Sequence, residues 1–384
     1  MAALAGGLRQ RGWDTAAVLP ERGELAERLE AAGVELTVRP LAVLRRRLLN
    51  PRGLARLAAE AARERGALAE LARGAALVHS NTSVILGGAP AAKSARIPHV
   101  VHVREIYEGA ASGLAARAWP LLRDRLMRAQ ARICVSAAAA EQFAEGDGDF
   151  GSGTHVVHDG LTRIPRVHPA RGADRRRADP DPHGAADAAR EKLRIAPDTF
   201  VVAVLGRIAD WKGQDILARA LAEPALGDVG ATGLIAGDAY PGEAAPDIAG
   251  LAARLGLADR LRLLGFRPEP DDVLAAADVV AVPSTRPDPL PNSAIEALAA
   301  GRPVVAAAHG GLPEIVRDRV TGLLVRPGDP VVLAKALREL ADDPERRAAM
   351  GQAGAADARE RFGLERMLDE VEGVYASLAV RRPR

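Results

Sequence analysis

Residues 283–314 constrain the fold of this chain more than any other stretch. They follow a short β-branched run at 279–282 (VVAV), which is typical of a buried parallel strand. Three prolines then stiffen a loop, and a helix can begin at Asn292 and end near Gly301. A second apolar run follows at 304–307. The order is strand, loop, helix, strand, and such units place their ligands at the carboxyl ends of the strands.

Two carboxylates bracket the start of this helix: Asp288 in the loop and Glu296 in the second helical turn. The free amide groups of a helix start, together with the helix dipole, favour a phosphate. A nucleotide-sugar suits this layout, with sugar hydroxyls near Asp288, the diphosphate on the amides and ribose hydroxyls near Glu296. A second interpretation stays open, because Ser293 and Glu296 also match the S-x-x-E capping box that closes a helix on itself.

The length of 384 residues suits two domains, each with its own core. A single cysteine, Cys134, rules out a disulfide framework and favours a reducing compartment. No window approaches the ~18 apolar residues that a membrane-spanning helix needs, and no signal-peptide pattern is present. We therefore expect a cytoplasmic protein, either soluble or bound peripherally at the inner face of the membrane.

A basic helical pattern over residues 41–73 is the candidate for such membrane contact. Arg45, Arg46 and Arg47 precede two leucines, and a basic amphipathic helix can lie on an anionic membrane. Acidic residues later in the same stretch fit the alternative, which is the solvated face of a core helix. Both interpretations remain open.

The first half opens with a helical pattern at 2–11, whereas an open parallel α/β domain usually opens with a strand and a glycine turn. Gly6 and Gly7 do not replace that turn, because they fall within the helical pattern, where glycine weakens a helix. We expect the missing strand and turn to lie upstream of Met1. The remaining strands of a Rossmann-like domain over 1–168 are expected at 15–19, 34–38, 76–79, 98–103, 132–135 and 155–157.

His102 and Arg104 lie near the carboxyl end of the strand at 98–103 and, with a period of two, point to the same side. In a functional interpretation His102 forms hydrogen bonds with a sugar and Arg104 holds an anionic group. The alternative is that His102 packs within the strand and Arg104 pairs with Glu105.

The second half, over 193–363, repeats the alternation of strand and helix. A linker or exposed loop is expected over 169–192, where charged residues and proline are frequent and apolar residues are few. The first strand of the second half is followed by Gly206, Arg207 and Lys212, and the two cations suit a diphosphate. Further strands are expected at 233–236, 261–264, 279–282, 304–307 and 323–325. The last helix, within 364–384, is expected to pack back on the first domain.

With these residues in hand, the chain resembles the family-4 glycosyltransferases, which are retaining enzymes of the GT-B fold. The motifs GRIADWKGQD, AGDAYPGE, LRLLGF, AAADVVAVPST, DPLPNSAIEALAAGRPVVA and GGLPEIV occur in the order of that family. Looser matches in the first half are VHSNTSVILGG, IPHVVHVREIY, ICVSAAAAEQF and VVHDGL. The resemblance implies an α/β protein with two Rossmann-like domains that face a central cleft, the first on the acceptor side and the second binding the nucleotide-sugar.

The resemblance also assigns roles to residues. Arg207 and Lys212 match the pair that neutralises the donor diphosphate, and Asp288 and Glu296 match a carboxylate pair that contacts the donor sugar and the ribose. The catalytic set is therefore Arg207, Lys212, Asp288, His102 and Arg104. The donor-binding set is Gly206, Arg207, Lys212, Gly265, Phe266, Arg267, Asp288, Leu290, Asn292, Ser293 and Glu296, in which Asn292 and Ser293 offer backbone amides and 265–267 lie near the base.

Three departures from the family pattern bear on these roles. Asp288 replaces the usual glutamate, which shortens the reach to the sugar. Leu290 and Pro291 replace the common Phe-Gly. In the first domain Arg104 stands where the family has its catalytic-side histidine, and His102 comes two positions early.

The reaction implied is transfer of a hexose from a nucleoside-diphosphate sugar to an acceptor hydroxyl with retention of configuration, in polysaccharide, glycolipid or cell-envelope glycoconjugate synthesis. Neither a metal nor a cofactor is expected, because two cations and a helix start stabilise the leaving diphosphate. The acceptor is a saccharide, a lipid-linked molecule or a small molecule, and no nucleic acid is expected. Two alternatives remain: a catalytically impaired nucleotide-sugar-binding protein, and an epimerase or phosphorylase of the same architecture.

Overall fold

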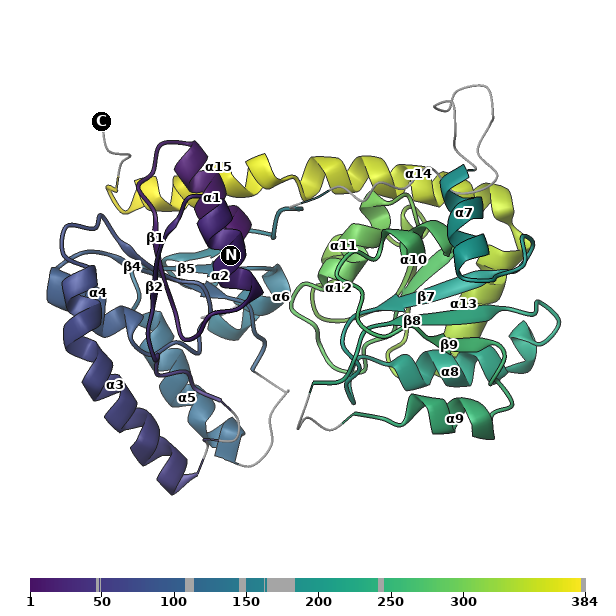
Figure 1. Cartoon of the computed structure of the whole chain (residues 1–384), viewed down its shortest axis with the longest axis horizontal. Coiled ribbons are helices and arrows are strands. Elements are labelled where there is room, and N and C mark those ends of the chain that lie inside the picture. Colours follow the sequence, from purple (N-terminus) through teal and green to yellow (C-terminus); the bar gives the residue numbers. More distant parts are fainter. Residues whose placement is uncertain are drawn as a thin grey trace. The chain divides into compact units, whose positions relative to one another are not determined.

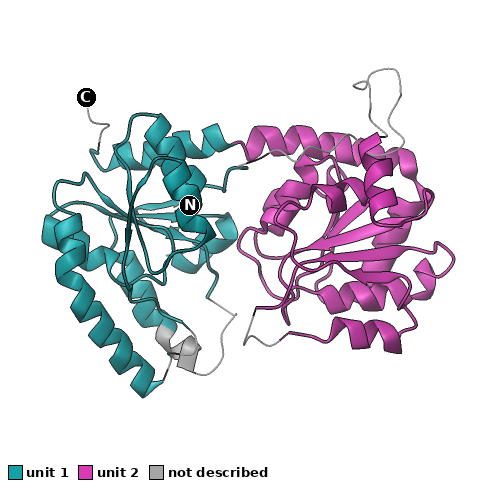
Figure 2. Cartoon of the chain, in the orientation of Figure 1, with its two compact units in different colours: residues 1–162, 364–384 teal, residues 163–363 magenta. Residues whose placement is uncertain are grey.

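A computed structural model describes residues 1–45, 48, 50–107, 114–144, 150–161, 163, 184–240 and 245–380, without the side chains of 114–118. The chain divides into two compact units, which Figure 2 shows in different colours. Unit 1 comprises 1–162 and 364–384, and unit 2 comprises 163–363. Within the described ranges, no helix combines the length and apolar character that crossing a bilayer requires.

Unit 2 contains a six-stranded parallel sheet with the order β12-β11-β10-β7-β8-β9. After β7, the chain adds β8 and β9 on one side of this strand and then β10, β11 and β12 on its other side. The carboxyl ends of β7 and β10 therefore form the topological switch point, where α/β proteins bind ligands. The strands are β7 (Val201–Leu205), β8 (Thr232–Ala236), β9 (Leu261–Leu263), β10 (Val279–Val282), β11 (Val304–Ala307) and β12 (Gly322–Val325).

Helices cover both faces of this sheet (Figure 1), with α8, α9 and α13 on one face and α7, α10, α11 and α14 on the other. Because both faces are covered, the β7 and β10 side chains are almost wholly buried, which explains their continuous valine-rich runs. The helices are α7 (Gly184–Lys192), α8 (Gln214–Ala222), α9 (Ile248–Arg254), α10 (Asp271–Ala276), α11 (Asn292–Ala299), α12 (Leu312–Ile315), α13 (Pro330–Asp342) and α14 (Pro344–Arg361), with a 3-10 turn at Pro224–Leu226.

Unit 1 has a two-stranded parallel sheet, β1-β2, and a four-stranded parallel sheet, β3-β4-β5-β6. The strands are β1 (Ala16–Leu19), β2 (Glu35–Val38), β3 (Val78–Ser80), β4 (His99–Val103), β5 (Ala131–Cys134) and β6 (Thr154–Val156). The helices are α1 (Ala2–Gln10), α2 (Glu24–Ala31), α3 (Pro51–Leu71), α4 (Gly88–Ala95), α5 (Leu114–Met127), α6 (Ala137–Ala140) and α15 (Leu364–Ser377), with a 3-10 turn at Glu141–Phe143. Together the two units confirm the predicted α/β class with parallel sheets.

The C-terminal helix α15 packs on the N-terminal helix α1 within unit 1 (Figure 1). Arg11 forms ion pairs with three carboxylates on one side of α15: Glu365, Asp369 and Glu372. A Cβ atom on Gly7 would lie 2.6 Å from Leu368, so this glycine permits the close approach of the two helices. The expectation that Gly6 and Gly7 only weaken the first helix was therefore incomplete.

Two further sequence expectations need correction. The helix expected over 41–73 begins only at Pro51, because Asn50 caps it by accepting a hydrogen bond from the Gly53 amide at 2.9 Å, with proline at the first helical position. Part of the segment expected as a linker, 169–192, is helix α7 of unit 2, while residues 169–183 lie outside the described part of the chain. Arg190 fixes this helix through a buried ion pair with Asp278, 2.8 Å long.

Candidate functional site

The loops that follow β7 and β8 meet through their glycines at the switch point of unit 2. Gly237 has a φ of +149°, and a Cβ atom there would overlap the carbonyl oxygen of Gly206. The Gly206 amide donates to the carbonyl of Ala236 at 2.9 Å, which continues the sheet pairing into the loop. These close approaches bring Arg207, the next residue, to the edge of the sheet.

The loop after β7 also packs on the loop after β10. Gly213 has a φ of +77°, and a Cβ atom on it would overlap the carbonyl oxygen of Pro283. The amide of Thr285 donates to the Trp211 carbonyl at 2.7 Å. The structure therefore brings together the two motifs that the sequence separates by more than seventy positions.

Lys212 and Asp288 form an ion pair across this junction, with Nζ 2.6 Å from Oδ2. The side chain of Asp288 is only 8% exposed and that of Lys212 is 21% exposed. A buried carboxylate needs such a partner, because an unpaired charge away from water is costly. The lysine retains access to solvent, so an incoming anion can share it.

Two glycines after β11 hold the backbone of Asp288. The Gly311 amide donates to the Asp288 carbonyl at 2.8 Å. Gly310 has a φ of +59°, and a Cβ atom on it would lie 2.7 Å from the Asp288 amide nitrogen and closer still to its carbonyl oxygen. Asp288 is thus positioned from two strands, β10 and β11. Neither glycine was assigned a role in the site from the sequence.

Arg207 lies beside two aromatic rings. Its guanidinium carbon is 5.8 Å from the ring centre of Trp211 and 5.3 Å from that of Tyr240, which is 59% exposed. The Lys212 ammonium is 4.5 Å from the same Trp211 ring. Both predicted cations therefore converge on one tryptophan, with distances in the range of cation–π contacts. Neither ring was assigned a role from the sequence.

Helix α11 begins at Asn292 without a side-chain cap. Pro291 occupies the capping position, and Ser293 lies inside the helix, so the S-x-x-E capping box considered as an alternative does not form. The Ala294 amide donates to the Pro291 carbonyl at 3.0 Å. Among the described residues, the amides of Asn292 and Ser293 have no acceptor, and amides in this position can bind an anion.

Glu296 is partly buried in α11, and burial raises the pKa of its carboxyl group above the usual value. The positive charge of Arg163 lowers this pKa, and the negative charge of Asp271 raises it. Arg163 forms a two-pronged ion pair with Asp271, with nitrogen–oxygen distances of 2.7 and 2.8 Å. Neither Arg163 nor Asp271 was singled out from the sequence, because nothing local relates them to α11.

The remaining predicted donor residues lie in different environments. Gly265 has a φ of +69°, and the adjoining Phe266 amide donates to Asp238 at 3.0 Å. Phe266 is 66% exposed. Arg267 pairs with Asp272 at 3.2 Å. Leu290 is buried. Whether these residues contact a donor stays a prediction.

In unit 1, His102 is fully buried within β4, and neither of its ring nitrogens has a hydrogen-bond partner among the described residues. Burial lowers the pKa of His102 well below its usual value, and the positive charge of Arg104 lowers it further. His102 thus matches the alternative that it packs within the strand. The neighbouring ring of His79, 5.5 Å away between ring centres, has its pKa lowered to about 3 for the same reasons.

Arg104 pairs with Asp159, not with Glu105. Its two terminal nitrogens lie 2.6 and 2.8 Å from the carboxylate oxygens of Asp159, a residue 55 positions later in the chain. Glu105 instead accepts hydrogen bonds from the hydroxyls of Thr82 and Ser83. The ion pair proposed between neighbours in sequence was therefore wrong, and each charge has a partner on another element.

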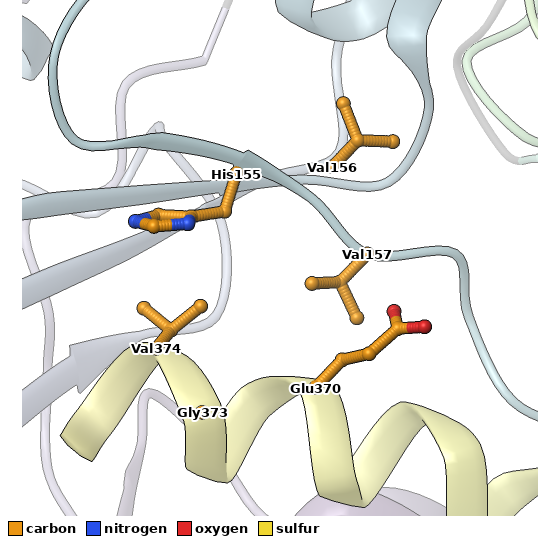
Figure 3. Close-up of a pocket in the computed structure, with 6 residues that line it drawn as sticks. All are labelled: His155, Val156, Val157, Glu370, Gly373 and Val374. Atoms are coloured by element: carbon orange, nitrogen blue, oxygen red, sulfur yellow. The ribbon is translucent and has the colours of Figure 1, made fainter. Parts of the chain in front are cut away.

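A separate pocket of about 260 Å³ lies in unit 1 between the edge strand β6 and helix α15 (Figure 3). His155 and Val157 line it from the strand side, and Glu370, Gly373 and Val374 line it from α15. None of the residues predicted for the site lines this pocket.

Comparison with known proteins relates both units to one group of enzymes. A family model described as "Glycosyltransferase Family 4" matches residues 1–162, and one described as "Glycosyl transferases group 1" matches residues 186–357. The D-inositol 3-phosphate glycosyltransferase of Streptomyces avermitilis is 38% identical over 226 residues, which are 56% of this chain and 47% of that protein. That of Corynebacterium aurimucosum is 40% identical over 211 residues, 53% of this chain and 49% of that protein. The chain matches about half the length of these curated relatives.

Solved structures resemble the whole chain. The crystal structure of Anabaena Alr3699/HepE in complex with UDP and glucose has a TM-score of 0.79 and 27% identity, and covers 98% of this chain and 94% of its own. The complex of the same protein with UDP-glucose has a TM-score of 0.78 with the same identity and coverage. A sucrose-phosphate synthase from Thermosynechococcus elongatus, at 21% identity and a TM-score of 0.75, shows the fold alone. A glycosyltransferase family model matches each half of the chain, and the fold of the solved glycosyltransferase structures matches nearly the whole chain. The chain therefore belongs to the family-4 glycosyltransferases of the GT-B fold.

Proposed function

We propose that this chain is a retaining glycosyltransferase that transfers a hexose from a nucleoside-diphosphate sugar to an acceptor hydroxyl. One observation carries the proposal: a lysine that is partly open to solvent pairs with a buried aspartate at the switch point of unit 2, on the loop that leads into α11. Family membership and the likeness to a protein crystallised with UDP-glucose support the same donor class.

The diphosphate binds to the cations and to the helix start. Lys212 and Arg207 converge on Trp211, and the amides of Asn292 and Ser293 offer two further donors. When the glycosidic bond breaks, negative charge grows on the leaving diphosphate. Groups already oriented toward that charge stabilise the transition state without reorganising, and this electrostatic effect is often the largest in an enzyme.

Asp288 orients the sugar instead of attacking it. Its carboxylate is held by Lys212 and its backbone by Gly310 and Gly311, so the side chain presents one fixed edge to the donor. When the diphosphate binds, it shares Lys212, and the released carboxylate oxygen accepts a sugar hydroxyl. Glu296, one turn into α11, accepts the ribose hydroxyls in its ionised form.

The acceptor binds on the side of unit 1, where Arg104 and Asp159 provide both signs of charge at the carboxyl end of the sheet. A saccharide, a lipid-linked molecule and a small molecule remain the candidate classes, with glycoconjugate or polysaccharide synthesis as the setting. Peripheral contact with the cytoplasmic face of a membrane is a further proposal. Its basis is α3, which exposes Arg52, Leu54 and Arg56 on its surface.

The test begins with binding. Calorimetry with UDP, GDP, ADP and their glucose conjugates should give tight binding for one base and weak binding for the others. Mass spectrometry of reactions with the preferred donor and a panel of acceptors should then detect transfer, and NMR of the product should show the anomeric configuration of the donor. Full turnover after treatment with EDTA is expected.

The same assays separate the alternatives. Binding without turnover for every acceptor would favour a nucleotide-sugar-binding protein. An altered sugar recovered from donor alone would favour an epimerase, and release of a sugar phosphate only when inorganic phosphate is present would favour a phosphorylase. If no nucleotide binds, the proposed function is wrong.

A further inference from the structure

His309 follows β11 at the carboxyl edge of the unit 2 sheet, and its side chain reaches the loop that follows β10. Its Nε2 atom lies 2.8 Å from the backbone carbonyl oxygen of Ser284. A carbonyl oxygen can only accept a hydrogen bond, so Nε2 carries the proton and donates. Ser284 is fully buried, and its hydroxyl has no hydrogen-bond partner in the described part of the chain. This residue is therefore held through its backbone, and His309 provides one of the contacts that hold it.

The same two loops meet again four residues further along, at Asp288. The Gly311 amide donates to the Asp288 carbonyl at 2.8 Å, and a Cβ atom on Gly310 would lie 2.7 Å from the Asp288 amide nitrogen. His309, Gly310 and Gly311 are consecutive, so one short segment after β11 contacts the loop both at residue 284 and at residue 288. Of these contacts, the one at residue 284 is made by a side chain, so a substitution can remove it and leave the backbone contacts intact.

The loop after β7 contacts the same segment. Strands β7 and β11 flank β10 in the sheet. The Thr285 amide donates to the Trp211 carbonyl at 2.7 Å, and Lys212, the residue after Trp211, pairs with Asp288. Each end of the segment 284–288 is therefore held from both flanking strands.

We propose that His309 is a positioning residue for the sugar end of the donor, because its hydrogen bond to Ser284 fixes the loop that carries Asp288. This inference rests on the proposed function, in which Asp288 orients the sugar. The strength of a hydrogen bond depends steeply on distance and angle, so a small displacement of the loop turns the carboxylate away from the sugar hydroxyls.

The groups proposed for the diphosphate are held differently. Arg207 and Lys212 belong to the loop after β7. The two amides at the start of α11 belong to a helix that packs on α14, β10 and β11. Because these elements have packing contacts of their own, loss of the His309 bond should weaken recognition of the sugar and leave binding of the diphosphate nearly unchanged.

The experiment measures the affinities for UDP-glucose and for UDP by calorimetry at a single pH, in two variants of His309. Glutamine carries its amide nitrogen at about the reach of the histidine Nε2 atom, so His309→Gln keeps a donor for the Ser284 carbonyl. Asparagine carries its amide nitrogen at about the position of Nδ1, so His309→Asn loses this hydrogen bond. The control is His155→Asn, since His155 is also partly buried but lies on β6 of unit 1.

The sugar-dependent part of the affinity should fall in His309→Asn. Binding of UDP-glucose should weaken about tenfold, as expected for a misdirected hydrogen bond to a charged group, while UDP should stay within about twofold of the wild type. His309→Gln should recover most of the loss, and His155→Asn should match the wild type. In an Asp288→Ala background, His309→Asn should cause no further loss of UDP-glucose affinity, because its effect acts through Asp288.

Three results would overturn the inference while the proposed function stands. The first is unchanged binding of UDP-glucose in His309→Asn. The second is an equal loss for UDP and UDP-glucose, which would indicate general damage to unit 2. The third is a full additional loss in the Asp288→Ala background, which would show that His309 does not act through Asp288.

A ligand-free measurement separates failure of this inference from failure of the proposed function. Hydrogen–deuterium exchange followed by mass spectrometry reports on the amides of residues 284–290 whether or not a nucleotide binds. Exchange in this segment should be faster in His309→Asn than in the wild type and in His309→Gln, with exchange in α13 unchanged. Equal exchange in all three proteins would show that His309 does not hold the loop.

Discussion

In unit 2, the loops at the carboxyl edge of the sheet contact one another through glycines and backbone atoms. In unit 1, the loops at the corresponding edge are held by side chains that bind one another. In unit 2, Gly213, Gly237 and Gly310 let three loops touch without intervening side chains. In unit 1, Arg104 is held by Asp159, and the buried ring of His102 lies 5.5 Å from the partly buried ring of His79. The architecture is the same, but the means of fixing the loops differs.

This difference in how the loops are held leaves different groups available at the two edges. At the edge of unit 2, the amides of Asn292 and Ser293 have no acceptor within the described ranges, and Lys212 is partly open to solvent. The edge of unit 1 keeps its histidines neutral in the interior, since burial and the charge of Arg104 both disfavour their protonation. We therefore expect substitutions at the edge of unit 2 to lower turnover, and we expect acid to destabilise unit 1 at a higher pH than unit 2.

The largest expected effect comes from Lys212→Ala. The variant removes a cation from the leaving diphosphate and leaves Asp288 buried without its partner. Turnover should fall by roughly 10²–10³-fold, the usual cost of removing one preorganised group that stabilises transition-state charge. Steady-state kinetics with a saturating donor measures this, and Lys335→Ala on the surface of α13 is the control. Turnover close to that of the wild type would show that the switch point of unit 2 is not the reaction centre.

Acid should destabilise unit 1 before unit 2. The pKa of folded His79 is about 3, below its usual value of 6.5, so the unfolded chain binds more protons between these values. The stability due to the neutral histidine is therefore complete above pH 6.5 and is lost as pH falls toward 3, with about 2 kcal/mol lost by pH 5 from this residue alone. His79→Gln should weaken this dependence.

Tryptophan fluorescence resolves the two units during denaturation. The chain has three tryptophans, of which Trp13 and Trp119 lie in unit 1 and Trp211 lies in unit 2. Trp211→Phe reports on unit 1, and the double variant Trp13→Phe/Trp119→Phe reports on unit 2. Equal loss of stability in both reporters on acidification would remove the contrast between the two edges.

Gly310→Ala tests whether backbone contact positions Asp288. Its control is Gly230→Ala, because Gly230 has nearly the same φ, +63°, and a Cβ atom on it would have no neighbouring atom within 4 Å. Both variants incur the strain of a left-handed conformation, about 1 kcal/mol. Only Gly310→Ala displaces Asp288, so kcat/KM should fall more than about tenfold in that variant alone, in line with the cost of misplacing a substrate-binding group. An equal loss in both variants would assign the effect to strain.

The parts of the site that the sequence predicted depend on local signals and on one rule of topology. Prolines and an alanine-rich helix mark the start of α11 at Asn292, and the rule that parallel strands end on one edge places Lys212 near Asp288 although 76 residues separate them. The start of α3 was predicted wrongly, at residue 41 instead of Pro51, although an asparagine followed by proline is a common helix start.

The parts that sequence reasoning missed depend on which side chains meet across elements. Arg104 has an acidic neighbour in sequence, yet its partner is Asp159 on another loop. Gly7 looked unfavourable for a helix until Leu368, at the far end of the chain, was placed against it. Arg163 carries no motif at all, yet it forms a two-pronged ion pair with Asp271, which lies 108 positions later in the chain.

The smallest expected effect comes from substitutions of Tyr240, which test whether its aromatic ring or its hydroxyl positions Arg207 at the edge of unit 2. The guanidinium carbon of Arg207 is 5.3 Å from the ring centre of Tyr240, and Tyr240 is itself mostly exposed. The ring therefore contacts the guanidinium through a cation–π interaction without burying it. Such a contact at an exposed site contributes about 0.5–1 kcal/mol, so Tyr240→Leu should lower kcat/KM by about two- to fivefold. Tyr240→Phe keeps the ring and should stay close to the wild type. If the phenylalanine variant loses as much as the leucine variant, the hydroxyl matters and not the ring face. If neither loses activity, the Tyr240 ring does not position the arginine, and the backbone of the glycine loop contributes more to the edge of unit 2 than this ring does.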